Sequence, residues 1–240
     1  MNETEFLYFT MALKNDNCHI RRKAISDLGL SPCNESNSKL IDDINSKKII
    51  PILINALNDT DKYVRLLSAE ALTSIDRNFQ EVSAFTIMKT LIDISACKER
   101  ETILADHSYD TSYYQGEEDL TIAEAANFVI ADLGGYLSES TPEVIQLFIN
   151  PDSEYRDAVA YASSFMLYDN ELAFIKALAD ENKLVRLGAI DALSALGEDE
   201  ELYREMQEVL PALTKASEDE DNQVSEAASK LLKSLNSFSA

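Results

Sequence analysis

The residue types best suited to catalysis are few and widely separated in this sequence. Cys18 and His19 are the one adjacent thiol–imidazole pair. Neighbours on a helix do not face each other, and no acidic residue has the spacing to orient the imidazole, so a structural or surface role is favoured. Cys33 and Cys97 are too scattered for a disulfide framework or a CxxC metal site. Phosphate-binding glycine loops, nucleophile elbows and zinc-ligand spacings are absent from the sequence, which predicts no catalytic residue, metal ligand or cofactor.

Potential binding residues gather instead between Lys98 and Asp119. This segment mixes one histidine and several tyrosines with carboxylates: His107, Tyr109, Tyr113, Tyr114, Glu117, Glu118 and Asp119. Tyrosines supply rigid contact area at a small entropic cost, which is why aromatic residues are enriched in interfaces. Two interpretations stay open: a partner-binding loop formed by these residues, or an acidic mobile loop whose tyrosines are incidental.

The charge of the chain favours some partners over others. The formal net charge is −22, and residues 81–240 hold 32 Asp and Glu against 11 Lys and Arg, whereas residues 1–80 are nearly balanced. Such a surface repels nucleic-acid phosphates and anionic lipids, and it attracts basic proteins. Solubility is the alternative explanation for the same charge. The acidic runs Glu198–Glu201 and Glu218–Asp221 are interpreted as solvated turns.

The sequence also bears on location. No apolar run approaches the roughly 20 residues that span a membrane. The first residues lack the basic region of a secretory signal. Together with the scattered cysteines, these features predict a cytoplasmic protein.

A helical repeat must position these residues. Leu172–Gly197 is interpreted as two short helices joined by a polar turn, and residues 51–75 match it at type-specific positions. Three of the five prolines share one repeat position: Pro51, Pro142 and Pro211. This register predicts one domain, residues 1–240, with about five to six helical hairpins at 6–29, 46–75, 83–134, 141–167, 170–197 and 203–235. The third hairpin carries an insertion at 98–119, a length typical of functional or disordered loops.

Residue types that recur at equivalent repeat positions have structural explanations. Val185, Ala189 and Ala192 recur at helical spacing and form an apolar stripe whose small residues allow close helix packing. Asp61 and Asn182 stand just before second helices, where a short polar side chain caps free N–H groups.

A second set of repeat positions is charged. Its arginines and turn aspartates are interpreted as structural ion pairs, with ligand anchoring as the alternative: Arg21, Arg65, Arg156, Arg186, Asp59 and Asp180. Ala123 and Ser225 stand where repeats 3 and 6 would have the arginine, so the ladder is predicted to be incomplete.

The consensus A-L-x-D-x-(D/N)-x-x-V-R-x-x-A-x-x-A-L, clearest at residues 56–72 and 177–193, resembles HEAT repeats. It is especially similar to the HEAT-like repeats of the phycobilisome lyase group. The resemblance implies an all-α fold, a right-handed α-α superhelix. Proteins of this broad superfamily usually act as curved scaffolds for another macromolecule, whereas the lyase-like branch attaches bilins to phycobiliprotein cysteines, removes them or chaperones the process.

We therefore expect a non-enzymatic protein-binding scaffold whose second helices line an acidic concave surface. Its partner would be a protein with a basic surface, and adaptor, assembly-factor, inhibitor or immunity roles all fit. The alternative implied by the resemblance is a bilin lyase-related subunit or chaperone acting on phycobiliproteins, with bilin as its ligand. A DNA mimic that occupies a nucleic-acid-binding protein is a third hypothesis, and it follows from charge alone.

Overall fold

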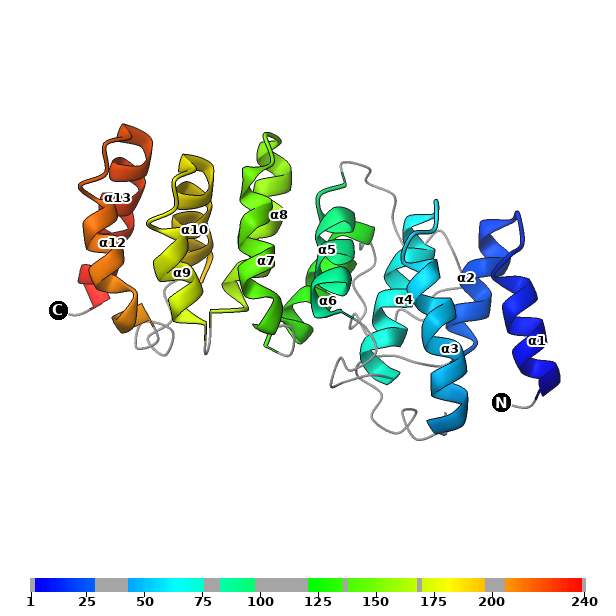
Figure 1. Ribbon diagram of the computed structural model, residues 1–240. Helices are drawn as coiled ribbons and strands as arrows, with labels where there is room; N and C mark the ends of the chain where they lie inside the picture. The colour runs from blue at the N-terminus through cyan, green and yellow to red at the C-terminus, as the bar shows by residue number, and fades with distance from the viewer. Residues whose placement is uncertain are drawn as a thin grey trace. The chain divides into compact units, whose positions relative to one another are not determined.

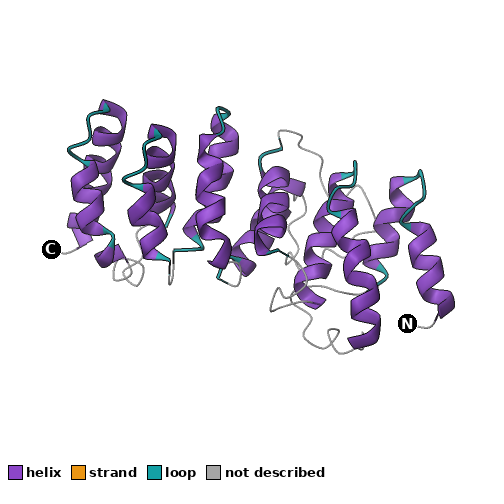
Figure 2. Ribbon diagram, viewed as in Figure 1, coloured by secondary structure: helices purple, strands orange, loops and turns teal. Residues whose placement is uncertain are grey.

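The computed structural model describes residues 3–28, 43–75, 83–97, 121–135, 138–167, 170–196 and 206–238. Within these ranges the regular elements are helices, and no strand is present (Figure 1, Figure 2). The chain forms two compact units, Met1–Val129 and Ile130–Ala240. In each unit, helices follow one another in pairs.

The first unit contains three consecutive helix pairs among its described residues. They are α1 (Glu3–Ala12) with α2 (Cys18–Ser26), α3 (Asp43–Ala56) with α4 (Lys62–Ile75), and α5 (Ala84–Ser95) with α6 (Ile122–Leu133), whose last residues belong to the second unit. The α4 helix is central, because it packs against α2, α3 and α5. Its side chains are buried along nearly the whole helix.

The second unit also contains three helix pairs among its described residues. They are α7 (Thr141–Gln146) with α8 (Ser153–Ser164), α9 (Glu171–Ala177) with α10 (Lys183–Ala195), and α12 (Leu210–Ala216) with α13 (Asn222–Phe238). Short 3-10 turns accompany them at Ser138–Ser140, Leu147–Ile149 and Met206–Glu208. The second helices α8, α10 and α13 pack in sequence, and α7, α9 and α12 form a layer in front of them (Figure 1).

Small residues set the spacing between the helices of the second unit. Val185, Ala189 and Ala192 are buried on α10, as the apolar stripe predicted. Gly188 brings the same helix even closer to a neighbour, since a Cβ atom there would lie 2.1 Å from the ring of Phe148. The alanine stripe was predictable from its spacing, whereas the glycine contact was missed because its partner lies 40 residues away.

The predicted fold class, an all-α superhelix of helical hairpins, is confirmed: two helices fall in each of the six predicted repeats. Pro142 and Pro211 lie in the first turns of α7 and α12, where a missing N–H costs nothing, but Pro51 lies inside α3. The insertion at 98–119 lies outside the described residues, and the single-domain organisation stays a prediction. Among the described helices, none combines the length and the apolar character needed to cross a membrane.

Candidate functional site

The turn between the two helices is built in the same way in the five repeats whose turns are described. An Asn or Asp side chain accepts a bond of 2.8–3.0 Å from the backbone N–H two residues later. That second residue, again Asn or Asp, caps the following helix. The pairs are Asn15 and Asn17, Asp59 and Asp61, Asn150 and Asp152, Asp180 and Asn182, and Asp219 and Asp221. The caps predicted at Asp61 and Asn182 are therefore confirmed.

The recurring arginines hold these turns from inside the second helices. In each case Nη1 donates to the backbone carbonyl six residues earlier, at 2.7–2.8 Å, and to the next carbonyl as well. The arginines concerned are Arg21, Arg65, Arg156 and Arg186. One donor nitrogen of each guanidinium therefore has a purely structural role within its own repeat.

Two of these arginines also reach the turn of the next repeat. Arg21 donates to both carboxylate oxygens of Asp59, from Nε to Oδ2 at 2.8 Å and from Nη2 to Oδ1 at 2.7 Å. Arg186 holds Asp219 in a similar way: Nη2 donates to Oδ1 at 3.0 Å, and Nε lies 2.9 Å from Oδ2 without hydrogen-bond alignment. The hydrogen bonds that Arg21 donates to Asp59 raise the pKa of Arg21, although burial opposes the shift. Both arginines are buried, and each ion pair joins a second helix to the turn of the next repeat.

Asp180 occupies the same turn position but has no arginine partner among the described residues. Its side chain accepts the backbone N–H of Asn182 at 2.8 Å. Arg156, which stands where Arg21 and Arg186 stand in their repeats, donates to two carbonyls of its own turn and to no carboxylate among the described residues. Of the two predicted turn aspartates, Asp59 has an arginine partner, whereas Asp180 has no ion pair within the described part of the chain.

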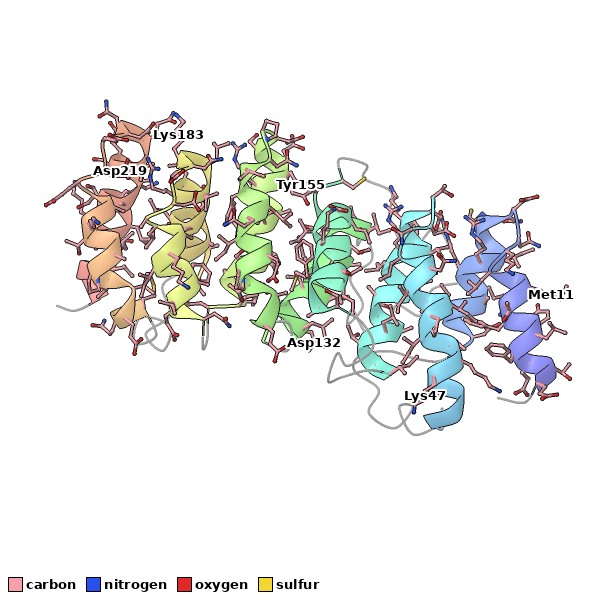
Figure 3. The ribbon with its side chains drawn as sticks, in the orientation of Figure 1. Met11, Lys47, Asp132, Tyr155, Lys183 and Asp219 are labelled. Carbon is pink, nitrogen blue, oxygen red and sulfur yellow. The ribbon has the colours of Figure 1, made fainter. Side chains whose placement is uncertain are left out.

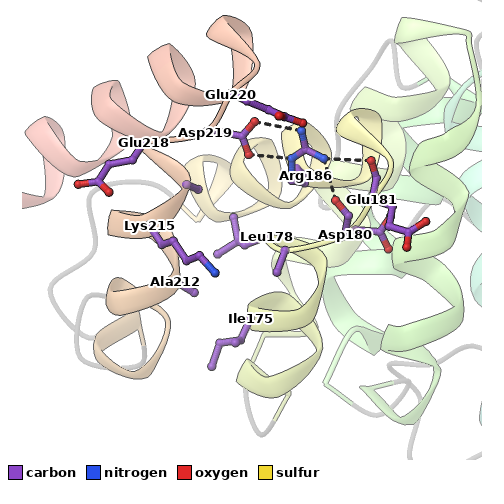
Figure 4. A pocket seen from close by; sticks show the side chains of 12 residues that line it. Ile175, Leu178, Asp180, Glu181, Arg186, Ala212, Lys215, Glu218, Asp219 and Glu220 are labelled. Atoms are coloured by element: carbon purple, nitrogen blue, oxygen red, sulfur yellow. Dashed lines mark hydrogen bonds and ion pairs between the residues drawn. The ribbon is translucent and has the colours of Figure 1, made fainter.

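A groove lies between the first helices of the last two repeats, and we call it the α9–α12 groove. Its volume is about 710 Å³. Ile175, Leu178 and Ala212 supply its apolar lining, and Arg186 lies at the turn end between Asp219 and the carbonyls of Asp180 and Glu181 (Figure 4). Because Arg186 already binds these groups, it shapes the end of the groove more than it offers a free charge.

The rim of the α9–α12 groove is acidic. Glu181, Glu218 and Glu220 line it and are exposed, while Lys215 is the exposed cation on its α12 side (Figure 4). Lys183 and Asp219 lie at the same end of the second unit (Figure 3). An apolar floor with a mostly acidic rim suits long side chains that end in a positive charge, since their stems bury while their charged ends stay at the edge.

A smaller groove, here called the α7–α9 groove, lies on the other side of α9. Its volume is about 350 Å³, and Ile145, Leu172 and Ala173 contribute to its lining. Leu172 is 62% exposed and presents apolar surface beside this groove. Asp180 lines both grooves, so the unpaired turn aspartate stands where they meet.

The second helices of this unit carry a further group of carboxylates and aromatic rings. Partial burial and the nearby charge of Asp157 raise the pKa of Asp191, although Arg156 lowers it. Tyr161 and Phe165 lie on α8 and at its end, with ring centroids 5.0 Å apart in an edge-to-face arrangement. The acidic concave surface expected on the second helices stays a prediction.

The partner-binding residues predicted in the insertion, from His107 to Asp119, lie outside the described residues and stay a prediction. The two grooves were missed by sequence reasoning, which placed the contacts on the second helices. Exposed Leu172 and the small residues Ala173 and Ala212 on first helices were the available signal. Within the described part of the chain, no three His, Cys, Asp or Glu side chains are arranged to hold a metal ion.

Comparison with protein families identifies the second repeat. Residues 49–79, which include the turn of Asp59 and Asp61, match the family model of the HEAT repeat. This segment of the chain is therefore similar to a HEAT repeat. The resemblance to HEAT-like repeats is thereby supported, whereas the likeness to the phycobilisome lyase group stays a prediction. No curated protein matches the chain.

Several solved structures are similar along nearly the whole length of the chain. Two engineered proteins are 15% and 16% identical, cover 99% of this chain and 98% and 100% of their own chains, and have TM-scores of 0.38 and 0.42. A designed armadillo repeat protein in complex with the peptide (KR)4 is 14% identical, covers 98% of this chain and 100% of its own, and has a TM-score of 0.36. At these identities and scores, no function or partner is carried over from them to this chain.

Proposed function

We propose that the chain is a protein-binding scaffold whose second unit holds a basic segment of a protein partner. The observation that carries the proposal is the α9–α12 groove, which joins an apolar floor to an exposed acidic rim. Lys and Arg fit such a groove because their aliphatic stems bury against Ile175 and Leu178 while their charged ends reach Glu181 or Glu218. The occupant is therefore a peptide segment that combines apolar and basic side chains.

The charge around the groove supports the same partner. Residues 130–240 contain 22 Asp and Glu against 8 Lys and Arg. A field of this sign accelerates the approach of a basic protein and disfavours nucleic acids. Helical repeats commonly present extended surfaces of this kind, and an adaptor, an assembly factor or an inhibitor of a basic target would each use one.

A labelled peptide tests the proposal directly. The probe is a fluorescein-labelled decapeptide in which leucine and arginine alternate, so that in an extended chain leucines face one side and arginines the other. Its binding to the full chain is followed by fluorescence polarisation at low and high salt. We expect saturable binding that weakens as salt screens the acidic rim.

Two alanine substitutions separate the groove from the rest of the surface. Ala179 is exposed and lines the α9–α12 groove, whereas Ala195 is exposed at the end of α10 and lines neither groove. Ala179→Trp should fill the groove and raise the Kd of the probe by about tenfold or more, a change of about 1.4 kcal/mol. Ala195→Trp should leave the Kd unchanged. Undiminished binding by Ala179→Trp, or no binding by the wild-type chain at low salt, contradicts the proposal.

A further inference from the structure

Where one repeat supplies the arginine and the next described turn supplies a carboxylate, the junctions differ in one interaction. Between the first two repeats, Arg21 donates two hydrogen bonds to the turn carboxylate of Asp59. Between the last two, Arg186 holds Asp219 at 2.9 and 3.0 Å. Between the fourth and fifth repeats, Arg156 donates to carbonyls of its own turn. Asp180, in the turn of the fifth repeat, has no ion pair among the described residues.

We infer that Asp180 anchors an arginine of the bound partner, which takes the place that Arg21 and Arg186 hold at the other two junctions. The inference rests on the proposed function and names the residue of the scaffold that selects the partner's side chain. Asp180 is suitable because it lines both the α7–α9 and the α9–α12 groove, so a partner lying in either one can reach it.

The geometry favours arginine over lysine. At Asp59 both carboxylate oxygens are bound by two nitrogens of one guanidinium, at 2.7 and 2.8 Å. A planar guanidinium makes two parallel bonds of this kind, whereas a lysine ammonium acts as a point charge. Lys176 also lines the α7–α9 groove, but no ion pair joins it to Asp180 among the described residues. The apolar wall of Ile145 and Ala177 provides a surface for the arginine stem.

Asparagine is a suitable replacement at position 180 because the chain already uses it in equivalent turns. Asn15 and Asn150 occupy this turn position, and their side chains accept the N–H of Asn17 and Asp152 at 2.9 and 3.0 Å. Asp180→Asn therefore keeps the turn and removes only the negative charge. Its melting temperature should equal that of the wild-type chain.

The test compares two decapeptides, the alternating leucine–arginine probe and a matched leucine–lysine peptide. The wild-type chain should bind the arginine peptide about tenfold more tightly, the effect of one good charged hydrogen-bonding pair. Asp180→Asn should lose this preference and bind both peptides with similar Kd. Glu181→Gln removes one exposed charge from the neighbouring rim and should keep the preference, which separates a specific anchor from general electrostatics.

The outcomes distinguish failure of the proposed function from failure of the anchor alone. If the wild-type chain binds neither peptide, the proposed function fails and the inference fails with it. If it binds both without preference, or if Asp180→Asn keeps the preference for arginine, the scaffold proposal stands and the anchor at Asp180 is refuted. The peptide comparison on the wild-type chain needs no variant, so a folding defect cannot mask the result.

Discussion

Replacing Gly188 by alanine tests the packing that holds the second unit together. A Cβ atom at this position would lie 2.1, 2.2 and 2.5 Å from three ring carbons of Phe148, where ordinary contacts begin at 3.4 Å. The nearest ring atom would therefore have to retreat by at least 1.3 Å, the difference between 3.4 and 2.1 Å. Phe148 is fully buried, so the ring has no solvent-filled space to enter.

The magnitude follows from two opposing effects. Overpacking a buried site costs about 1–3 kcal/mol, and a fully enclosed aromatic ring belongs at the upper end of that range. Alanine in place of glycine inside a helix recovers about 1 kcal/mol of helix propensity. We therefore expect Gly188→Ala to lower the free energy of unfolding of the second unit by about 2 kcal/mol.

Urea unfolding followed by circular dichroism measures this change, and hydrogen exchange of the α10 amides reports it locally. The control is Gly135→Ala, because a Cβ at Gly135 meets nothing within 4 Å. Phe148→Leu should lower the free energy of unfolding by less in the Gly188→Ala variant than in the wild-type chain, because the shorter side chain relieves the overlap with the Cβ atom added at position 188. Equal stabilities for the two glycine variants would refute the argument that α10 needs a glycine against Phe148.

Three further predictions concern the ion pairs and the alternative function. Asp59→Asn keeps the turn but removes the carboxylate that pairs with buried Arg21. The free energy of unfolding, measured in urea, should fall by about 2 kcal/mol. The control Asp27→Asn changes an exposed ion pair and should leave the free energy of unfolding unchanged. Burial alone would raise the pKa of Asp61, but the hydrogen bond from Arg22 brings it below the ordinary 3.8. The stability that this pair contributes is therefore present above pH 3.8 and is lost as the pH falls through the lowered pKa of Asp61. Asp61→Asn should make the melting temperature depend less on pH in the acid range. An unchanged dependence would contradict this prediction. Adding a linear tetrapyrrole to the purified chain should leave the visible absorption band of the pigment unshifted, whereas a shift would favour the bilin-related alternative.

The helical repeats could be predicted from the sequence because their determinants are local or periodic. The turn bonds join residues two or three positions apart, and the arginine bonds to carbonyls join residues five or six positions apart. Residue types at these spacings imply the same geometry wherever they recur. The turns of Asp59 and Asp180 therefore have the same local hydrogen bonds. The apolar stripe on α10 follows from helical periodicity in the same way.

The grooves could not be predicted, because they depend on how far apart consecutive first helices lie. That distance is set by contacts between residues of different repeats, such as Gly188 against Phe148. The residues predicted to bind a partner in the insertion fall outside the described ranges. Residues of α9, α12 and their turns form the candidate site in the described part of the chain. Sequence periodicity located these elements and did not show that a space remains between them.

Asp59 and Asp180 show where the two sources of information divide. The sequence by itself determined that both are turn residues of a helical repeat, because their hydrogen bonds to Asp61 and Asn182 need only the local chain. Tertiary structure alone decided that Arg21 binds Asp59. It also decided that Asp180 lines two grooves and has no arginine partner among the residues that the structure describes. An ion pair between repeats requires the guanidinium to arrive within about 3 Å in the correct orientation, and that depends on the stacking of neighbouring repeats rather than on residue type.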